Sequence, residues 1–501
     1  MSKLIAQNVT ILPTGITPAP SGAAYPRISY DAILALPSPV KGDMAYDETF
    51  DCLRIYTGSK WICTYQKPKD PPNITALGTA GGTNDDYATD VVVDATGAVY
   101  ITGAFSGTIS FGLVTKTSNG QEDIFLAKYS GSGTLLWAVS YGGFGNDGGN
   151  ALTINSSGNI IVTGYFEGNV NFGSIPKSSA GAFDVFVVTC SNLDGAVSTV
   201  FTVGGIQNEA VKDVAIDGAG SIFLTGSFSG TVNFGGISKT SVNSNEDAYV
   251  AKFNSVGAAQ WVATGGGTSS DLAEKIAIDN AGSVIITGRY FGTTTFGSFS
   301  QTALNIDDIF VAKYTNSGVI LWLQSAGSYN SDKVYDIITD ASGGIYLTGS
   351  YSGTAIFGSL TNSSQGSSID IYLAKYDSGG TPLWLQSAGG FSNDEARGIA
   401  LDASGSIYVS GYFFGGTKFG NINLSSAGNE DAFIAKYNPT TLIWEWAISA
   451  GGAATDYPFA LAKSPTGILY VTGFFNATVN IGPVSKISAG GKDIFIAKID
   501  K

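Results

Sequence analysis

The residues best suited to chemistry in this chain are acids that recur at fixed places in a repeated segment. One aspartate stands just before an apolar, strand-forming run in every copy: Asp123, Asp184, Asp247, Asp308, Asp370, Asp431 and Asp493. Further acids occupy the connection between copies: Asp85, Asp86, Asp147, Glu209, Asp271, Asp332, Asp394, Glu395 and Asp456. Carboxylates combined with loop carbonyls are the ligands that Ca²⁺ prefers, so one interpretation of the pattern is a ring of calcium sites.

A structural interpretation competes with calcium binding. Each recurrent aspartate would accept hydrogen bonds from neighbouring Gly-Gly backbone N–H groups and fix its loop. No copy has the dense Asp-x-Asp-x-Asp spacing of a dedicated calcium loop. Presence in all seven copies also favours architecture, since catalysis usually needs one copy. We expect no cofactor, with calcium as the alternative.

The chain contains no histidine. This removes the commonest general base, the Ser-His and Cys-His nucleophile pairs, and histidine-ligated metals. We therefore expect a protein that is not an enzyme and assign no catalytic residue. The fold described below also carries hydrolases and lyases in other proteins, so fold alone does not decide this question.

Specific binding is expected where the repeat is broken, because positions shared by all copies serve the common scaffold. Arg289 stands where other copies have Ala, Ser, Tyr or Phe. Phe291 and Phe414 replace a serine that three other copies share. We predict that Arg289, Phe291 and Phe414 contact a ligand on a loop face.

The repeat itself predicts the elements that position these residues. A Thr-Gly or Ser-Gly pair, with an aromatic two residues after the glycine, closes a strand-like run at Gly103, Gly164, Gly226, Gly288, Gly349, Gly411 and Gly473. The glycines are spaced by 61 or 62 residues. A fixed period of this size, rich in strand formers, predicts an all-β fold, a seven-bladed β-propeller with four-stranded blades.

In the first copy the four strands are expected at about 88–93, 98–105, 123–129 and 134–141, with a longer connection before the third. Strand direction alternates, so the recurrent aspartates and the acids between copies should share one face. The last copy lacks a fourth strand, and a segment at about 74–80 aligns with the fourth strand of the others. We expect that segment to complete the last blade and close the ring.

Two motifs carry a resemblance to a known family. Residues 94–107 have the form Asp-x-x-Gly-x-hydrophobic-Tyr-hydrophobic-Thr-Gly-x-Phe-x-Gly, and residues 123–129 have the form Asp-x-Phe-hydrophobic-Ala-Lys-Tyr. Repeats of this kind across residues 73–501 resemble the bacterial seven-bladed β-propeller repeats called SBBP. The resemblance implies a propeller fold and is uninformative about function.

Residues 1–72 form a separate region in this interpretation, and residues 73–501 form the propeller. Six prolines precede residue 40, which favours an extended arm. Residues 41–63 are expected to form two or three short strands and resemble small β-modules of tail-fibre-like proteins. Cys52 and Cys63 flank a hairpin pattern there, and whether they are bridged is left open.

Charge and targeting signals constrain partners and location. The net charge of −14 opposes nucleic-acid binding, and no segment approaches membrane-spanning length. No Sec-type signal is expected, so the protein should be made in the cytoplasm. We predict a structural or adhesive component of a phage-tail-like particle or contractile injection system, docked to other subunits through residues 1–72 and released outside the cell. The alternative is a stand-alone propeller that binds cell-surface glycan.

Overall fold

The computed structural model describes residues 27–48, 52–66 and 70–500. The chain divides into two compact units, one within residues 1–70 and one formed by residues 71–439 and 443–501. Both are built mainly from β-strands. Among the described residues, no helix is long and apolar enough to cross a membrane.

The N-terminal unit is a small four-stranded sheet with one short helix. The strands β1 (Arg27–Ile28), β2 (Met44–Asp47), β3 (Cys52–Tyr56) and β4 (Trp61–Gln66) lie in that order across the sheet. The helix α1 (Tyr30–Leu34) is capped by the Ser29 side chain and buries Ile33. Of the two or three strands expected at residues 41–63, three are present, but the arm interpretation missed this helix. The rest of the expected arm, residues 1–26, lies outside the described residues.

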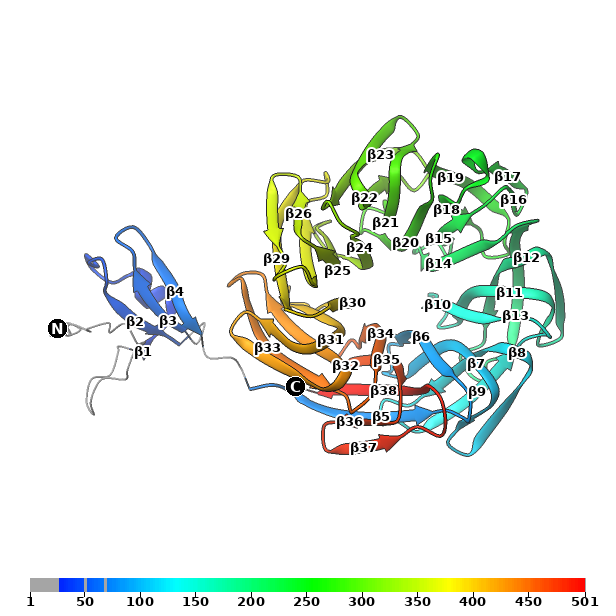
Figure 1. The fold of residues 1–501 in the computed structure, drawn as a ribbon, viewed down its shortest axis with the longest axis horizontal. Helices are drawn as coiled ribbons and strands as arrows, with labels where there is room; N and C mark the ends of the chain where they lie inside the picture. Colours follow the sequence, from blue (N-terminus) through cyan, green and yellow to red (C-terminus); the bar gives the residue numbers. More distant parts are fainter. Residues whose placement is uncertain (1–26, 49–51, 67–69, 501) are drawn as a thin grey trace. The chain divides into compact units, whose positions relative to one another are not determined.

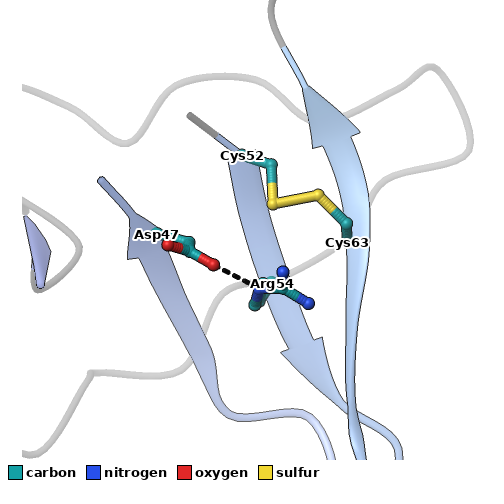
Figure 2. The surroundings of a disulfide bond; sticks show 4 residues. All are labelled: Asp47, Cys52, Arg54 and Cys63. Carbon is teal, nitrogen blue, oxygen red and sulfur yellow. Dashed lines mark hydrogen bonds and ion pairs between the residues drawn. A yellow bond between two sulfur atoms is a disulfide. The ribbon is translucent and has the colours of Figure 1, made fainter. Parts of the chain in front are cut away.

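Cys52 and Cys63 form a disulfide across β3 and β4 (Figure 2). A register shift after Leu53 places Cys63 opposite Arg54. Arg54 donates from Nε to Asp47 Oδ2 at 2.6 Å, and its guanidinium lies 4.3 Å from the centre of the Tyr30 ring. The bridge and the ion pair together tie β2, β3 and β4 to one another.

The larger unit contains seven four-stranded groups, which we number in chain order. Figure 1 shows them arranged around a common centre, with the first strand of each group innermost. Their strands are as follows: β6 (Asp86–Val93), β7 (Val99–Phe111), β8 (Val114–Tyr129) and β9 (Leu135–Tyr141); β10 (Gly148–Ile154), β11 (Ile160–Phe172), β12 (Ile175–Cys190) and β13 (Val197–Gly205); β14 (Glu209–Ile216), β15 (Ile222–Phe228), β18 (Asp247–Phe253) and β19 (Ala259–Gly267); β20 (Asp271–Ile278), β21 (Val284–Phe296), β22 (Phe299–Tyr314) and β23 (Ile320–Gly327); β24 (Lys333–Thr339), β25 (Ile345–Ser352), β28 (Ile369–Tyr376) and β29 (Pro382–Gly390); β30 (Asp394–Leu401), β31 (Ile407–Phe419), β32 (Ile422–Asn438) and β33 (Ile443–Ala450); β34 (Asp456–Lys463), β35 (Leu469–Phe475), β38 (Asp493–Asp500) and β5 (Asn73–Ala80).

The fourth strand of the seventh group comes from the other end of the sequence. Strand β5 pairs antiparallel with β38, from Ala80 opposite Ile494 to Asn73 opposite Asp500. This pairing confirms the prediction that the segment at about 74–80 completes the last group.

A hairpin between the second and third strands links each group to the one before it. It is continuous with those strands in some groups and separate in others, as β16 (Thr231–Phe234) with β17 (Ile237–Thr240), β26 (Thr354–Phe357) with β27 (Leu360–Ser363), and β36 (Thr478–Ile481) with β37 (Val484–Ile487). The hairpin pairs with the end of the preceding group's fourth strand, by strand pairing in four groups and by single bridges in three. The longer connection expected before the third strand is therefore a hairpin, which continues the sheet onto a neighbouring group.

The aromatics that follow the repeated glycines form the core between groups. The seven side chains are at most 1% exposed: Phe105, Phe166, Phe228, Tyr290, Tyr351, Phe413 and Phe475. In the third group, for example, the ring of Phe228 packs edge-on against Phe234 of the hairpin, with centroids 5.6 Å apart. The repeat thus encodes packing within and between groups.

Candidate functional site

The recurrent aspartates lie within the third strands or at their first residue, where they are buried and bind the backbone. The seven side chains are 1% to 5% exposed. In each group, one carboxylate oxygen accepts a hydrogen bond at 2.8–3.1 Å from the N–H of a residue four or five positions earlier in the chain: Asn119, Ala180, Val242, Leu304, Gln365, Ala427 and Ala489. Each aspartate therefore holds the backbone of the residues just before it in the chain.

The predicted partner of these aspartates was wrong in detail. In five of the connections between groups, the N–H of the second glycine donates instead to the acid of that connection, as Gly143 does to Asp147 at 2.7 Å. The first glycine of each pair leaves space for the recurrent aspartate. A Cβ on Gly142, for example, would overlap the Asp123 carboxylate. A Cβ on Gly143 would overlap the backbone carbonyl of Asn169 in the interlocking hairpin. Both glycines are needed because two neighbours approach the backbone closely.

The two sets of acids meet in pairs on one face, as the alternating strand directions predicted. Burial raises the pKa of Asp123 to about 6, with a contribution from Asp147. Burial raises the pKa of Glu209 to about 8, and Asp184 adds to that rise. Each pair joins the third strand of one group to the first strand of the next. We call the surface formed by these connections the loop face.

The pairs do not amount to a metal cluster. Within the described ranges, no group of three or more His, Cys, Asp or Glu side chains is placed to hold a metal ion. One oxygen of Asp123 and one of Asp147 already accept backbone N–H groups. Calcium binding at the seven aspartates stays a prediction.

The predicted contact residues lie near the loop face without forming one site. Arg289 on β21 is ion-paired with Glu274 at 3.6 Å and lies 3.9 Å from Asp307. Phe291 belongs to the same strand, and Phe414 is 43% exposed on β31, two groups further along the chain. None of the three lines the cavities described next.

A cavity of about 230 Å³ lies where the seven first strands converge, and we call it the central cavity. One equivalent position in each first strand lines it, and we call this the inner-wall position: Thr89, Asn150, Lys212, Glu274, Tyr335, Arg397 and Phe459. These residues are spaced by 61 or 62 positions, yet all seven differ in type. The core residues of the repeat are similar in every group, whereas the residue that lines the central cavity differs from group to group.

Arg397 is the most constrained cation of the lining. Its guanidinium lies 3.7 Å from the centre of the Tyr335 ring and 4.9 Å from that of Tyr457. It also donates to Glu395 Oε2 at 2.7 Å. Planar guanidinium groups stack on aromatic faces in this way, so Arg397 is held rigidly at the wall.

Three aspartates next to the inner wall, one in each of the first, third and fifth groups, bond to the next group along the chain, and sequence reasoning missed them. Asp90 accepts from Leu152 N–H at 2.8 Å, Asp213 from Ile276 N–H at 3.0 Å, and Asp336 from Ile399 N–H at 2.8 Å. Each bond joins the first strands of two consecutive groups. The sequence does show a sign of them: in the first, third and fifth groups, an acid follows the inner-wall position within an otherwise apolar first strand.

Lys275 occupies that same repeat position in the fourth group. Its Nζ lies 3.9 Å from Asp213 Oδ1. Burial disfavours its charge, but the carboxylates of Asp213, Asp336 and Asp90 hold the pKa of Lys275 above its ordinary value. The centre of the molecule therefore keeps a protonated lysine among acids.

A second hollow of about 570 Å³ opens on the loop face beside the second and third groups, and we call it the lateral cavity. It shares Asn150 and Lys212 with the central cavity. Its wall includes two aromatic side chains, Tyr165 and Phe183. Aromatic surface with a few polar groups is the usual make-up of a small-molecule site.

Comparison with known proteins gives distant relatives. No protein-family profile matches the chain, so the resemblance to SBBP repeats stays a prediction. The uncharacterized WD repeat-containing protein L264 of Acanthamoeba polyphaga mimivirus is 24% identical over 481 residues, covering 78% of this chain and 33% of that protein. The regulatory protein FlaEY of Caulobacter vibrioides is 29% identical over 167 residues, covering 32% of this chain and 17% of that protein. The chain thus spans a third or less of the length of either relative.

Solved structures align at low identity. The quinohemoprotein alcohol dehydrogenase from Comamonas testosteroni aligns with a TM-score of 0.40 and 9% identity, covering 86% of this chain and 76% of that chain. The V. cholerae biofilm matrix protein Bap1 aligns with a TM-score of 0.29 and 10% identity, covering 86% of this chain and 92% of that chain.

Proposed function

We propose that this protein is a non-enzymatic binding protein, in which a closed seven-bladed propeller is the binding head and residues 1–72 dock it to a larger assembly. The observation that carries the proposal is the inner-wall position, which is different in every group although the surrounding scaffold is repeated. A scaffold that only filled space would have no use for seven different side chains at one position. Pairing of β5 with β38 supports ring closure.

One further observation supports a binding role over catalysis, and another bears on where the protein works. The acids that could act in pairs have oxygens committed to backbone N–H groups, as Asp147 and Asp123 illustrate. The disulfide of the N-terminal unit fits a protein that works in an oxidising setting, outside the cytoplasm.

We keep a phage-tail-like or injection particle as the proposed assembly, on the resemblance of residues 41–63 to tail-fibre modules. Size fractionation of a native lysate, with electron microscopy of the fractions that contain the chain, tests it. The proposal expects the chain in particles of megadalton size, and expects deletion of residues 1–70 to release it. Recovery of the intact chain as a free species of its own mass would overturn the assembly role.

A further inference from the structure

The lateral cavity lies beside two groups that have small residues at one repeat position. Two residues before the inner-wall position, the groups have Tyr87, Gly148, Ala210, Leu272, Lys333, Glu395 and Tyr457. The two smallest residues at this position thus belong to the second and third groups, which are consecutive in the chain. A Cβ on Gly148 would come within 2.6 Å of the Tyr165 ring, so Gly148 lets that ring lie against the strand. The hollow is a local break in the repeat rather than a general property of it.

The aromatic part of the lateral cavity is fixed in orientation. The Tyr165 and Phe183 rings meet edge to face, with centroids 5.5 Å apart and planes at 85°. The Tyr165 hydroxyl lies 3.3 Å from Glu122 Oε2, and the Tyr87 hydroxyl donates to the same oxygen at 3.0 Å. A preformed aromatic surface lowers the entropy lost when a ligand binds.

The polar part of the cavity offers both donors and acceptors. Asn208 is exposed, and its Oδ1 accepts the Phe183 N–H at 3.3 Å, which orients its amide NH₂ group as a donor. Lys212 is an exposed donor, while Glu122 and Glu246 supply carboxylate acceptors. Hydroxyl groups, which both donate and accept, match such a mixed set better than an ion of either sign.

From this arrangement we infer that the lateral cavity binds a sugar unit of a glycan, with the ring's C–H face against Phe183 and Tyr165 and its hydroxyls on Asn208, Lys212 and Glu122. A volume of about 570 Å³ accommodates one or two pyranose rings. The inference rests on the proposed function, since it names the ligand class of the binding head.

The test is an array of neutral and amino-sugar oligosaccharides probed with the full chain, followed by calorimetric titration of the oligosaccharide that binds best. Asn208→Ala removes a donor and should weaken binding about tenfold, the equivalent of one hydrogen bond. Ala210→Leu introduces the side chain that the fourth group has at the equivalent position, Leu272. The larger side chain should fill the cavity and abolish binding.

Asn393→Ala is the matched control. Asn393 makes the same backbone contact in its own group, accepting the Ile369 N–H at 3.2 Å, but does not line the cavity. It should leave affinity unchanged, and unchanged melting temperatures show that each variant folds. The inference would be overturned by no binding on the array, or by an equal loss of affinity in Asn208→Ala and Asn393→Ala. If no oligosaccharide binds but fractionation still finds the chain in a large particle, only this inference is refuted. If the chain binds sugar but is recovered as a free species, only the assembly role is refuted.

Discussion

Replacing Asp123 with asparagine separates a structural carboxyl from a calcium ligand. The variant keeps an oxygen that accepts the Asn119 N–H, but it carries no charge. Burial raises the pKa of Asp123 from 3.8 to about 6 in the folded protein. Because the folded pKa lies above the unfolded one, the stabilising contribution of this group is complete below about pH 4 and is lost as pH rises through 6.

The size of the effect follows from that shift. One pKa unit corresponds to about 1.4 kcal/mol, so the charged carboxylate costs about 3 kcal/mol above pH 7, as an upper figure. About a third of that cost is already present at pH 4.5, so Asp123→Asn should gain stability relative to the wild type by up to about 2 kcal/mol between about pH 4.5 and pH 8. Denaturant unfolding followed by tryptophan fluorescence at the two pH values measures this difference.

Asp340→Asn is the control with the opposite sign. Burial raises the pKa of Asp340, but its hydrogen bonds to Ser342, Gly344 and Tyr346 outweigh burial and lower it to about 2. Its contribution is complete above about pH 4, so the variant should lose the same stability at both pH values. The reasoning is refuted if Asp123→Asn shows no pH-dependent gain. The calcium interpretation is supported instead if added Ca²⁺ raises the melting temperature of the wild type but not of the variant.

Three other outcomes are expected. Gly142→Ala should cost roughly 1–3 kcal/mol through overlap with the neighbouring carboxylate, whereas Gly218→Ala, with nothing within 4 Å of its added Cβ, should leave the melting temperature unchanged. Deleting residues 1–82 should leave the last group without its fourth strand and cause aggregation, whereas deleting residues 1–70 should leave a soluble, cooperatively unfolding propeller; equal behaviour of the two truncations would contradict the pairing of β5. Cys63→Ser should destabilise the N-terminal unit by about 3 kcal/mol and leave the unfolding of the larger unit unaltered, measured by calorimetry.

The strands and the buried aromatics could be predicted from the sequence because the same pattern occurs in all seven copies. The spacing of the Thr-Gly pairs gave the strands and the missing strand of the last copy, and β5 lies where that gap required it. The buried aromatics after each glycine also followed from strand alternation.

The hairpins that link neighbouring groups, and the residues that line the two cavities, were harder to predict. The hairpin strands lie in what looked like a loop, and their partner is in another group. The Gly-Gly pair looked like a hydrogen-bond donor for the recurrent aspartates, but the first glycine instead gives space to the carboxylate. The lateral cavity is lined by the small residue Ala210 and by Tyr165, whose ring lies against Gly148, and these neighbours become apparent only in the folded structure.

Cross-linking the two ends of the sequence tests the central claim, that the first and last segments share one blade and close the ring. Thr75 lies opposite Lys498 in the β5–β38 pair. The double variant Thr75→Cys with Lys498→Cys should form an intramolecular disulfide that spans nearly the whole chain and speeds migration on a non-reducing gel. Thr75→Cys with Lys436→Cys, which uses the same repeat position one group away, should not. A closed ring predicts the first cross-link alone; absence of that cross-link in folded protein, or formation of both, would contradict it.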